Sequence, residues 1–600
     1  MSDKDLNAPT WQMNDAYGDI GSPRWNDSLE RFRAHVEALA SIPVEEASLA
    51  RAWRHVDEAT TILSSLQCFV KCTGAKDQTD TRIAPTMAAL AAENARLAAA
   101  SRPFLDAILA LPAESPVLRE APVSDWAFEF KEKRTHWERA LAPADAAWWS
   151  ELKVRIISTL NYNYKALQKQ ATFKALDGEG NEVNVGPARL MTILKGDPDM
   201  VLRRNAVEGI RRGYGGLASL FADNLNTLNG LRHIAFKKAG TTQLDASLAQ
   251  NRMSRAALDA MKAAIEANID VIRESNTLRA PFFGSGRLAF EDLLAEPPAG
   301  GEGAPAAPKI PYDEGIAIAK KSLGKVNPEM ADFIDLLLEK GWVEAEMDDK
   351  KVGGAFYSRF NEFKIPRVFS TYVGTIHSVQ QQAHEMGHAF HYWKIRDLPV
   401  VQTEFPMTLT ETASTFNEAV VRHDLLEEAA PEKRFEMLWQ EVKSMSNMLL
   451  NIMARHEFEL LFLERLEKGY VNAETCCELM NEAWRKWYGD SATEDTYLWA
   501  HKLHFYKADQ LVYNYPYTVG YLMSQALMRE YLERGEAFYP FYIELLRDTG
   551  RMSVDDLIRK HFKADPTDTA FWQKAIDQAL CVMPEFRELA RKAAREINKK

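Results

Sequence analysis

Two histidines and a glutamate within residues 383–391 have the types and spacing of a metal site with an adjacent base. Residues four apart lie on one face of a helix, so His384 and His388 can point ring nitrogens at the same ion. Glu385 directly follows His384 and can reach a water molecule held by that ion. The chain has 13 histidines in 600 residues, so this arrangement seldom arises by chance, and other residues must complete the site.

The order His-Glu-x-x-His is typical of zinc peptidases, and a catalytic zinc site needs a third protein ligand and one open position. The metzincin class would have glycine at position 391 and histidine at position 394. This chain has His391 and Lys394, which excludes that class. His391 extends the face formed by His384 and His388, but a fourth protein ligand would close the open position. We therefore expect a structural role for His391.

The other common third ligand is a glutamate on a second helix. Residues 408–418 provide Glu411 and Glu418, and Glu404 lies shortly before them. Glu411 lies 23 residues after His388, which leaves room for the first helix to end and for a second helix to return beside it. We expect Glu411 to be the third ligand, with Glu418 as an alternative and Glu404 as a weaker one.

A second group of residues suited to catalysis lies near residue 510. Hydrolysis through a tetrahedral intermediate needs hydrogen-bond donors for the developing oxyanion, and histidine and tyrosine can supply them. A helix that begins near residue 516 would place Tyr517 and Tyr521 on one face, with Tyr513 in the preceding loop. His504 and Tyr517 are the expected donors and Tyr513 is the next choice, while Tyr521 and His501 remain alternatives.

The elements that must position these residues are mainly helical. Apolar residues recur at helical spacing, and the predicted helices cover residues 28–40, 45–72, 80–110, 142–169, 198–213, 218–239 and 254–282. Ser254 is a plausible N-cap for the last of these helices. Residues 245–249 are predicted to be a connector between helices. Turn residues within 173–181 predict a short hairpin.

Residues 352–375 depart from the helical pattern. The ranges 355–360 and 367–373 are rich in aromatic and β-branched residues, as strands are. The second range ends shortly before His384, so a small sheet is expected beside the metal-binding helix, where an edge strand can bind an extended peptide. Residues 296–311, which are rich in proline, glycine and alanine, predict a surface loop or linker.

Composition limits the class of protein. A net charge of -12 without a basic stripe argues against a nucleic-acid partner, and no apolar run is long enough to span a bilayer. Residues 1–7 lack the pattern of a signal peptide, and five irregularly placed cysteines are typical of a reducing compartment. We expect a soluble, cytoplasmic protein of several lobes without a membrane partner. The oligomeric state does not follow from the sequence.

The motif at residues 384–391, followed by residues 411–418, resembles the oligoendopeptidase F family of zinc metallopeptidases, part of the thimet-oligopeptidase group. The resemblance runs along most of the chain and is most specific in the metal motifs. It implies a mainly α fold, a multi-lobed helical ellipsoid with a deep substrate channel and a small β-sheet beside the zinc-binding helix. We expect an N-terminal helical lobe over residues 1–185 and a catalytic domain over residues 186–600, which contains the loop 296–311.

The resemblance also implies roles for individual residues. One zinc ion would be bound by His384, His388 and Glu411, with Glu385 as the general base. In that family a histidine and one or two tyrosines from a late segment stabilise the oxyanion. The expected activity is that of an endopeptidase that hydrolyses short unstructured peptides. The alternatives are a zinc exopeptidase, such as a carboxypeptidase or dipeptidyl carboxypeptidase, and a helical scaffold without catalysis.

Overall fold

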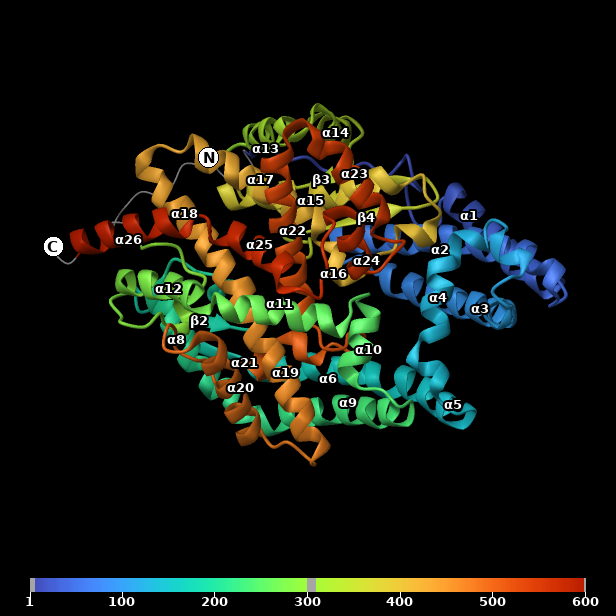
Figure 1. The fold of residues 1–600 in the computed structure, drawn as a ribbon, viewed down its shortest axis with the longest axis horizontal. Coiled ribbons are helices and arrows are strands. Elements are labelled where there is room, and N and C mark those ends of the chain that lie inside the picture. Colours follow the sequence, from blue (N-terminus) through green and yellow to red (C-terminus); the bar gives the residue numbers. More distant parts are fainter. Residues whose placement is uncertain (1–5, 299–308, 598–600) are drawn as a thin grey trace. The chain divides into compact units, whose positions relative to one another are not determined.

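The computed structural model describes residues 6–298 and 309–597, which are mainly helical with two small sheets (Figure 1). This confirms the predicted helical class. Of the predicted loop 296–311, residues 299–308 lie outside the described residues. Within the described ranges, no helix combines the length and the apolar character needed to cross a bilayer.

The chain divides into two compact units, each built from three separate segments. Unit 1 comprises Met1–Thr135, Ala307–Leu425 and Leu527–Lys563, and unit 2 comprises His136–Ala306, Leu426–Ala526 and Ala564–Lys600. Residues on both sides of the expected domain boundary at 185 and 186 belong to unit 2. The division into 1–185 and 186–600 stays a prediction.

Most helices lie wholly within one unit. Unit 1 contains α1 (Pro23–Ala40), α2 (Leu49–Lys76), α3 (Ile83–Ala110), α4 (Ala127–Thr135), α13 (Tyr312–Val326), α14 (Pro328–Glu339), α15 (Ile376–Ile395), α16 (Met407–Thr410), α23 (Phe538–Asp548) and α24 (Val554–Leu557). Unit 2 contains α5 (Pro143–Leu152), α6 (Ser158–Gln170), α7 (Pro187–Leu194), α8 (Met200–Gly213), α9 (Ala218–Lys238), α10 (Gln243–Gln250), α11 (Arg255–Ala267), α12 (Ile269–Arg279), α18 (Pro431–Ser446), α19 (Ile452–Glu467), α20 (Ala473–Tyr488), α21 (Leu498–His501), α25 (Thr569–Leu580) and α26 (Met583–Ile597). The unit boundaries at residues 425 and 526 fall inside α17 (Thr412–Glu428) and α22 (Tyr515–Arg534).

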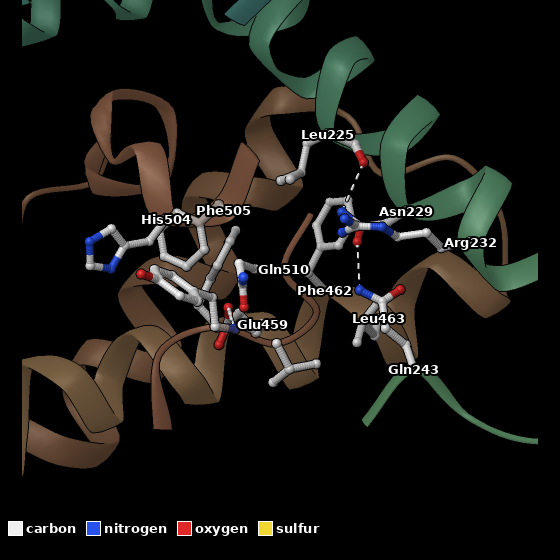
Figure 2. A pocket seen from close by; sticks show the side chains of 13 residues that line it. Leu225, Asn229, Arg232, Gln243, Glu459, Phe462, Leu463, His504, Phe505 and Gln510 are labelled. Carbon is white, nitrogen blue, oxygen red and sulfur yellow. Dashed lines mark hydrogen bonds between the residues drawn. The ribbon is translucent and has the colours of Figure 1, made fainter. Parts of the chain in front are cut away.

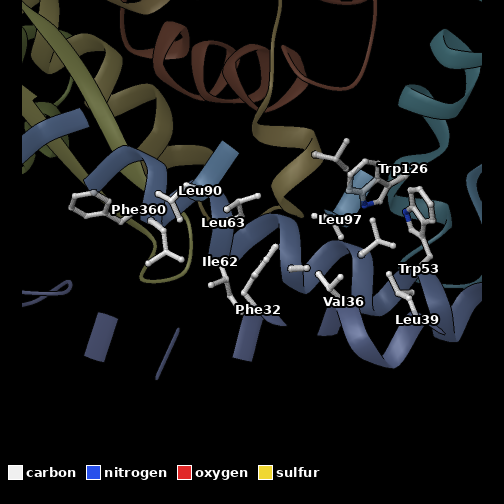
Figure 3. Close-up of a cluster of buried hydrophobic side chains, with 14 of the residues drawn as sticks. Phe32, Val36, Leu39, Trp53, Ile62, Leu63, Leu90, Leu97, Trp126 and Phe360 are labelled. Carbon is white, nitrogen blue, oxygen red and sulfur yellow. The ribbon is translucent and has the colours of Figure 1, made fainter. Parts of the chain in front are cut away.

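The first three helices of unit 1 share one hydrophobic core and lie side by side in Figure 1. Helix α1 begins after Ser22, whose hydroxyl accepts a hydrogen bond from the backbone of Trp25, and Pro23 suits the first turn. The core residues drawn in Figure 3 include Phe32, Val36, Leu39, Trp53, Ile62, Leu63, Leu90, Leu97, Trp126 and Phe360. Because Phe360 belongs to a strand, this helical layer also supports the sheet beside α15.

That sheet has three strands in the order β3, β5, β4. Strand β4 (Phe356–Phe360) is antiparallel to β5 (Ile365–Phe369), and β3 (Val343–Glu344) is parallel to β5 on the other side. The predicted first strand is confirmed. The predicted end of the second strand, residue 373, was wrong, because β5 ends at Phe369. Phe369 pairs with Glu344, the last residue of the two-residue strand β3. Strand β4 occupies an edge of the sheet.

Helix α15 carries the His-Glu-x-x-His motif and is enclosed on several sides. Thr375 and Ser378 form a capping box at its N-terminus, which satisfies backbone amides that a helix start leaves unpaired. The helix packs against β4, β5, α13, α14 and α23, and Phe390 packs edge-on against Phe333 of α14. A helix covered on most faces holds its side chains in fixed directions, as a metal site requires.

Three other sequence predictions can be compared with the structure. The hairpin is confirmed as β1 (Phe173–Leu176) paired with β2 (Glu182–Val185), and Ser254 does cap α11. The connector predicted at 245–249 was wrong, because these residues lie inside α10, which Thr242 caps. Burial of Leu244 and Leu248 stabilises this short helix, whose sequence alone is a weak helix former.

Candidate metal centre

The structure brings His384, His388 and Glu411 together in unit 1. One potential ligand atom from each residue lies within 4.8 Å of the other two. Oε2 of Glu411 is 3.2 Å from Nε2 of His384 and 3.4 Å from Nε2 of His388. Two imidazole nitrogens and one carboxylate oxygen around a common point are the donor set of a three-ligand zinc site.

Glu411 reaches the histidines because it lies at the junction of α16 and α17. The hydroxyl of Ser414 donates to Oε2 of Glu411 over 2.9 Å and fixes the carboxylate. Burial disfavours the charged form of Glu411, but the contacts with His384 and His388 outweigh it and hold its pKa well below the usual range. The carboxylate is therefore ionised, as a ligand must be.

Gly387 explains how closely the two helices approach, and sequence reasoning missed it. A Cβ atom at Gly387 would lie 2.8 Å from both the carbonyl oxygen of Ala413 and Cα of Ser414. Such distances are too short for a side chain, so only glycine lets α15 meet the backbone of α17 here. The available signal was a glycine in the middle of a helical segment, which is unfavourable without a packing reason.

The two other glutamates proposed as ligands have different partners. Oε2 of Glu418 lies 3.2 Å from Nδ1 of His384, and Glu418 also pairs with Arg422. Burial opposes ionisation of Glu418, yet Arg422 and His384 lower its pKa to about 2. A carboxylate on the far nitrogen of a ligating histidine orients the ring. Glu404 forms an ion pair with Arg359.

Glu385 shows that the site fits a metal ion with an adjacent base. Only 6% of this residue is exposed, and its Oε2 has no hydrogen-bond partner among the residues that the structure describes, which is costly for a buried oxygen. Burial raises the pKa of Glu385. On the sheet side, the ring of Tyr357 from β4 stacks on His388 with centroids 5.3 Å apart. The donor set and the unpartnered oxygen together suit a metal and a water molecule.

His391 faces away from this group of ligands. Its Nε2 lies 3.1 Å from the carbonyl oxygen of Leu546 and 2.9 Å from Oγ1 of Thr549, and its ring stacks on Phe405. Burial lowers the pKa of His391 to about 3, so the ring is neutral. These contacts tie α15 to α23 and agree with the structural role expected for His391.

Three of the predicted late residues form one aromatic cluster in unit 2. The ring of His504 stacks on Tyr517 with centroids 5.3 Å apart, and Tyr513 packs edge-on against both. The hydroxyl of Tyr517 donates to the hydroxyl of Tyr513 over 2.8 Å, and Lys507 also donates to Tyr513. The alternative His501 instead pairs with Asp495, outside the cluster.

Asn514, which sequence reasoning did not single out, determines the state of His504. Nδ1 of His504 lies 3.1 Å from Oδ1 of Asn514, and an amide oxygen only accepts, so the ring proton is on Nδ1. Burial, with Arg455 and Lys502 nearby, lowers the pKa of His504 to about 2. His504 is therefore neutral, and its Nε2 is an acceptor.

The described part of the chain places the His-Glu-x-x-His motif on α15 and Glu411 directly before α17. In a mainly helical protein this arrangement is that of the gluzincin type of metallopeptidase site. Residues 328–578 match the model described as Peptidase family M3. That segment, which includes α15, α17 and the cluster of His504, Tyr513 and Tyr517, is similar to Peptidase family M3. The chain is a distant relative of oligoendopeptidase F, and the resemblance inferred from its motifs is confirmed.

Individual relatives agree with this assignment. Oligoendopeptidase F, chromosomal, from Lactococcus lactis subsp. cremoris is 27% identical over 276 residues, which are 42% of this chain and 45% of that protein. The chain spans about half the length of the curated relatives that it matches.

Solved structures show the same fold at low sequence identity. A putative peptidase from Chlamydophila abortus is 18% identical with a TM-score of 0.82, over 98% of this chain and 99% of that one. Oligoendopeptidase-F from Enterococcus faecium is 18% identical with a TM-score of 0.67, over 94% of this chain and 97% of that one.

Proposed function

We propose that this protein is a zinc-dependent metalloendopeptidase that hydrolyses short unstructured peptides. The observation that carries the proposal is the convergence of His384, His388 and Glu411 beside the buried oxygen of Glu385, which has no partner in the described part of the chain. The match to Peptidase family M3 and the name oligoendopeptidase F of a relative support it. A deep channel that excludes folded proteins, and a cytoplasmic location, are parts of this proposal.

Each residue of the site has a separate role in the proposed hydrolysis. His384, His388 and Glu411 would hold one zinc ion, which when bound polarises a peptide carbonyl and lowers the pKa of water. Glu385 accepts a proton from the attacking water and delivers it to the leaving amine. Glu418 holds the ring of His384 through Nδ1, so that Nε2 of His384 keeps its direction.

The late cluster supplies donors for the oxyanion in this proposal. Tyr517 donates its hydroxyl proton to Tyr513. Tyr513 accepts this hydrogen bond and one from Lys507, which leaves its own proton for a substrate oxygen. His504 was expected to share this role. Because its proton is on Nδ1, facing Asn514, its Nε2 suits acceptance of a substrate N–H instead. Tyr513 is therefore the favoured donor, and Tyr517 would hold it in place through their hydrogen bond.

The test uses an internally quenched peptide whose two termini are both blocked. We expect cleavage within the peptide, loss of cleavage after removal of metal by a chelator, and recovery on addition of zinc. Removal of residues only from peptides with a free terminus would favour the exopeptidase alternative. A purified protein that binds no zinc and cleaves nothing would favour the scaffold alternative and overturn the proposal.

A further inference from the structure

The loop that carries Tyr513 is fixed by three polar side chains from other helices of unit 2. From α9, Arg232 donates to the carbonyl oxygens of Lys507 and Ala508 over 2.9 and 2.8 Å. From α10, Ser247 donates to the carbonyl oxygen of Leu511 over 2.6 Å. These bonds hold the backbone of the loop on its N-terminal side.

Glu459 of α19 holds the other end of the loop. One carboxylate oxygen accepts from the backbone N–H of Tyr513 over 2.8 Å, and the other accepts from that of Asn514 over 3.4 Å. The Glu459 side chain is only 10% exposed. Burial raises the pKa of Glu459 to about 8, although the hydrogen bonds from Tyr513 and Asn514 oppose this shift. A buried carboxyl group is costly in free energy unless it is hydrogen-bonded, and the amides of Tyr513 and Asn514 supply those hydrogen bonds.

The backbone at this point is strained. Val512 has a φ of 36°, in the left-handed region that a β-branched residue rarely adopts. Such a conformation is costly and persists only where the surroundings enforce it. Oγ of Ser247 also lies 3.2 Å from the carbonyl oxygen of Val512, and this hydroxyl shares its one proton between that oxygen and the carbonyl oxygen of Leu511. Glu459 binds the next two amides. The hydrogen bonds on both sides of Val512 therefore offset its strain.

The pocket that Glu459 lines is too small for a ligand, so ligand binding does not explain why Glu459 and Arg232 are buried there. Figure 2 shows Glu459 and His504 on one side of it, with Arg232, Asn229 and Gln243 on the other. Its cavity of about 30 Å³ has room for one or two water molecules, not for a peptide side chain. Asn229 and Gln243 hydrogen-bond to each other.

We propose that Glu459 is a positioning residue for the reaction, acting through the backbone of Tyr513 and Asn514. The proposal rests on the proposed function, because it assigns the late cluster a part in catalysis. Tyr513 bonds to Tyr517, and Asn514 bonds to His504. The two amides that Glu459 binds thus belong to the two residues that orient the rest of the cluster. Misplacement of a catalytic group by about 1 Å can cost on the order of 100-fold in rate.

The test compares Glu459→Ala and Glu459→Gln with a matched control on the same helix. Glu457 is similarly buried, at 13% exposure, but pairs with Lys486, so Glu457→Gln controls for loss of a buried carboxylate on α19. We expect kcat to fall at least 10-fold in Glu459→Ala, with KM and zinc content within about threefold of wild type. Glu459→Gln keeps one accepting oxygen and should recover part of kcat. Glu457→Gln should keep kcat within about threefold.

A second measurement does not depend on activity. Hydrogen exchange measured by mass spectrometry should be at least 10-fold faster in the peptide covering residues 507–517 of both Glu459 variants, and unchanged there in Glu457→Gln. Unchanged exchange in this peptide, or an unchanged kcat in Glu459→Ala, would overturn the proposal. So would a loss of kcat that merely follows loss of zinc or of folded protein. If wild type cleaves no peptide, the proposed function fails, while the exchange result still decides whether Glu459 holds the loop.

Discussion

The two carboxylates that contact His384 lie on opposite nitrogens of its ring, and this predicts unequal effects of removing them. Glu411 faces Nε2 beside His388, whereas Glu418 faces Nδ1. Loss of an orienting carboxylate typically weakens metal binding about 10–100-fold. We expect Glu418→Gln to fall in that range and Glu411→Ala to lose more than that.

Competition of each variant with a chromogenic zinc chelator measures these affinities. Glu404→Gln is the control, because Glu404 pairs with Arg359 and should not affect zinc binding. A variant Glu411→Ala with wild-type zinc affinity, or one that binds zinc better than Glu418→Gln does, would contradict the ligand assignment.

Because His391 is buried in its neutral form, the free energy of unfolding should depend on pH through its titration. Its pKa in the folded protein is about 3 because of burial, against about 6.5 in an unfolded chain. The unfolded chain therefore binds a proton first as the pH falls. The stability that neutral His391 contributes is complete above about pH 6.5 and is lost progressively as the pH falls toward 3.

The variant His391→Gln removes this titration while keeping a donor for the carbonyl oxygen of Leu546. Between pH 7.5 and pH 5, the urea midpoint of metal-free wild type should fall more steeply than that of His391→Gln. Metal-free protein is used so that release of zinc does not contribute. Equal slopes for the two proteins would contradict the account of His391.

At the scale of elements, local patterns in the sequence predicted the helices and the spacing of the motif, but not the contacts between helices. The period of apolar residues located α1, α8 and α9 to within a few residues, and the histidines four apart required only a helix. Local patterns did not reveal the contacts that join different elements. These are the close approach of Gly387 to α17, the hydrogen bond between Asn514 and His504, and the hydrogen bond of Glu459 with the backbone of Tyr513. Short segments such as α10 were mispredicted because tertiary burial overrides weak local propensity.

Gly387→Ala tests the close approach of α15 and α17. The added Cβ would lie 2.8 Å from backbone atoms of Ala413 and Ser414, so the helices must separate and Glu411 must move away from the histidines. Overpacking of this kind costs about 1–3 kcal/mol of stability, and zinc affinity should fall as well.

Gly230→Ala is the matched control for this substitution. Gly230 lies inside α9, and a Cβ atom there would meet nothing within 4 Å. The alanine should therefore stabilise the protein by about 0.5–1 kcal/mol through helix propensity. Thermal unfolding with and without zinc measures both variants. A Gly387→Ala protein with wild-type stability and zinc affinity would show that the contact does not position Glu411.

At the scale of the whole molecule, each compact unit is assembled from three separate parts of the chain. The boundary after residue 306 falls within the tract 296–311, which is rich in proline, glycine and alanine, but the boundaries after residues 425 and 526 fall inside the continuous helices α17 and α22, where no linker marks them. The sequence therefore suggested lobes but not their limits. The candidate ligands all belong to unit 1, and the cluster of His504, Tyr513 and Tyr517 belongs to unit 2.

The most direct test of the central claim is the rate of peptide cleavage by Glu385→Gln with its zinc content measured in the same sample. The substitution keeps the shape of the side chain and the three ligands but removes the base. We expect zinc bound at the wild-type ratio and a kcat reduced by at least 100-fold, within the usual contribution of about 10²–10⁴ from general acid–base catalysis. A zinc-loaded Glu385→Gln protein that cleaves peptides at the wild-type rate would contradict the central claim.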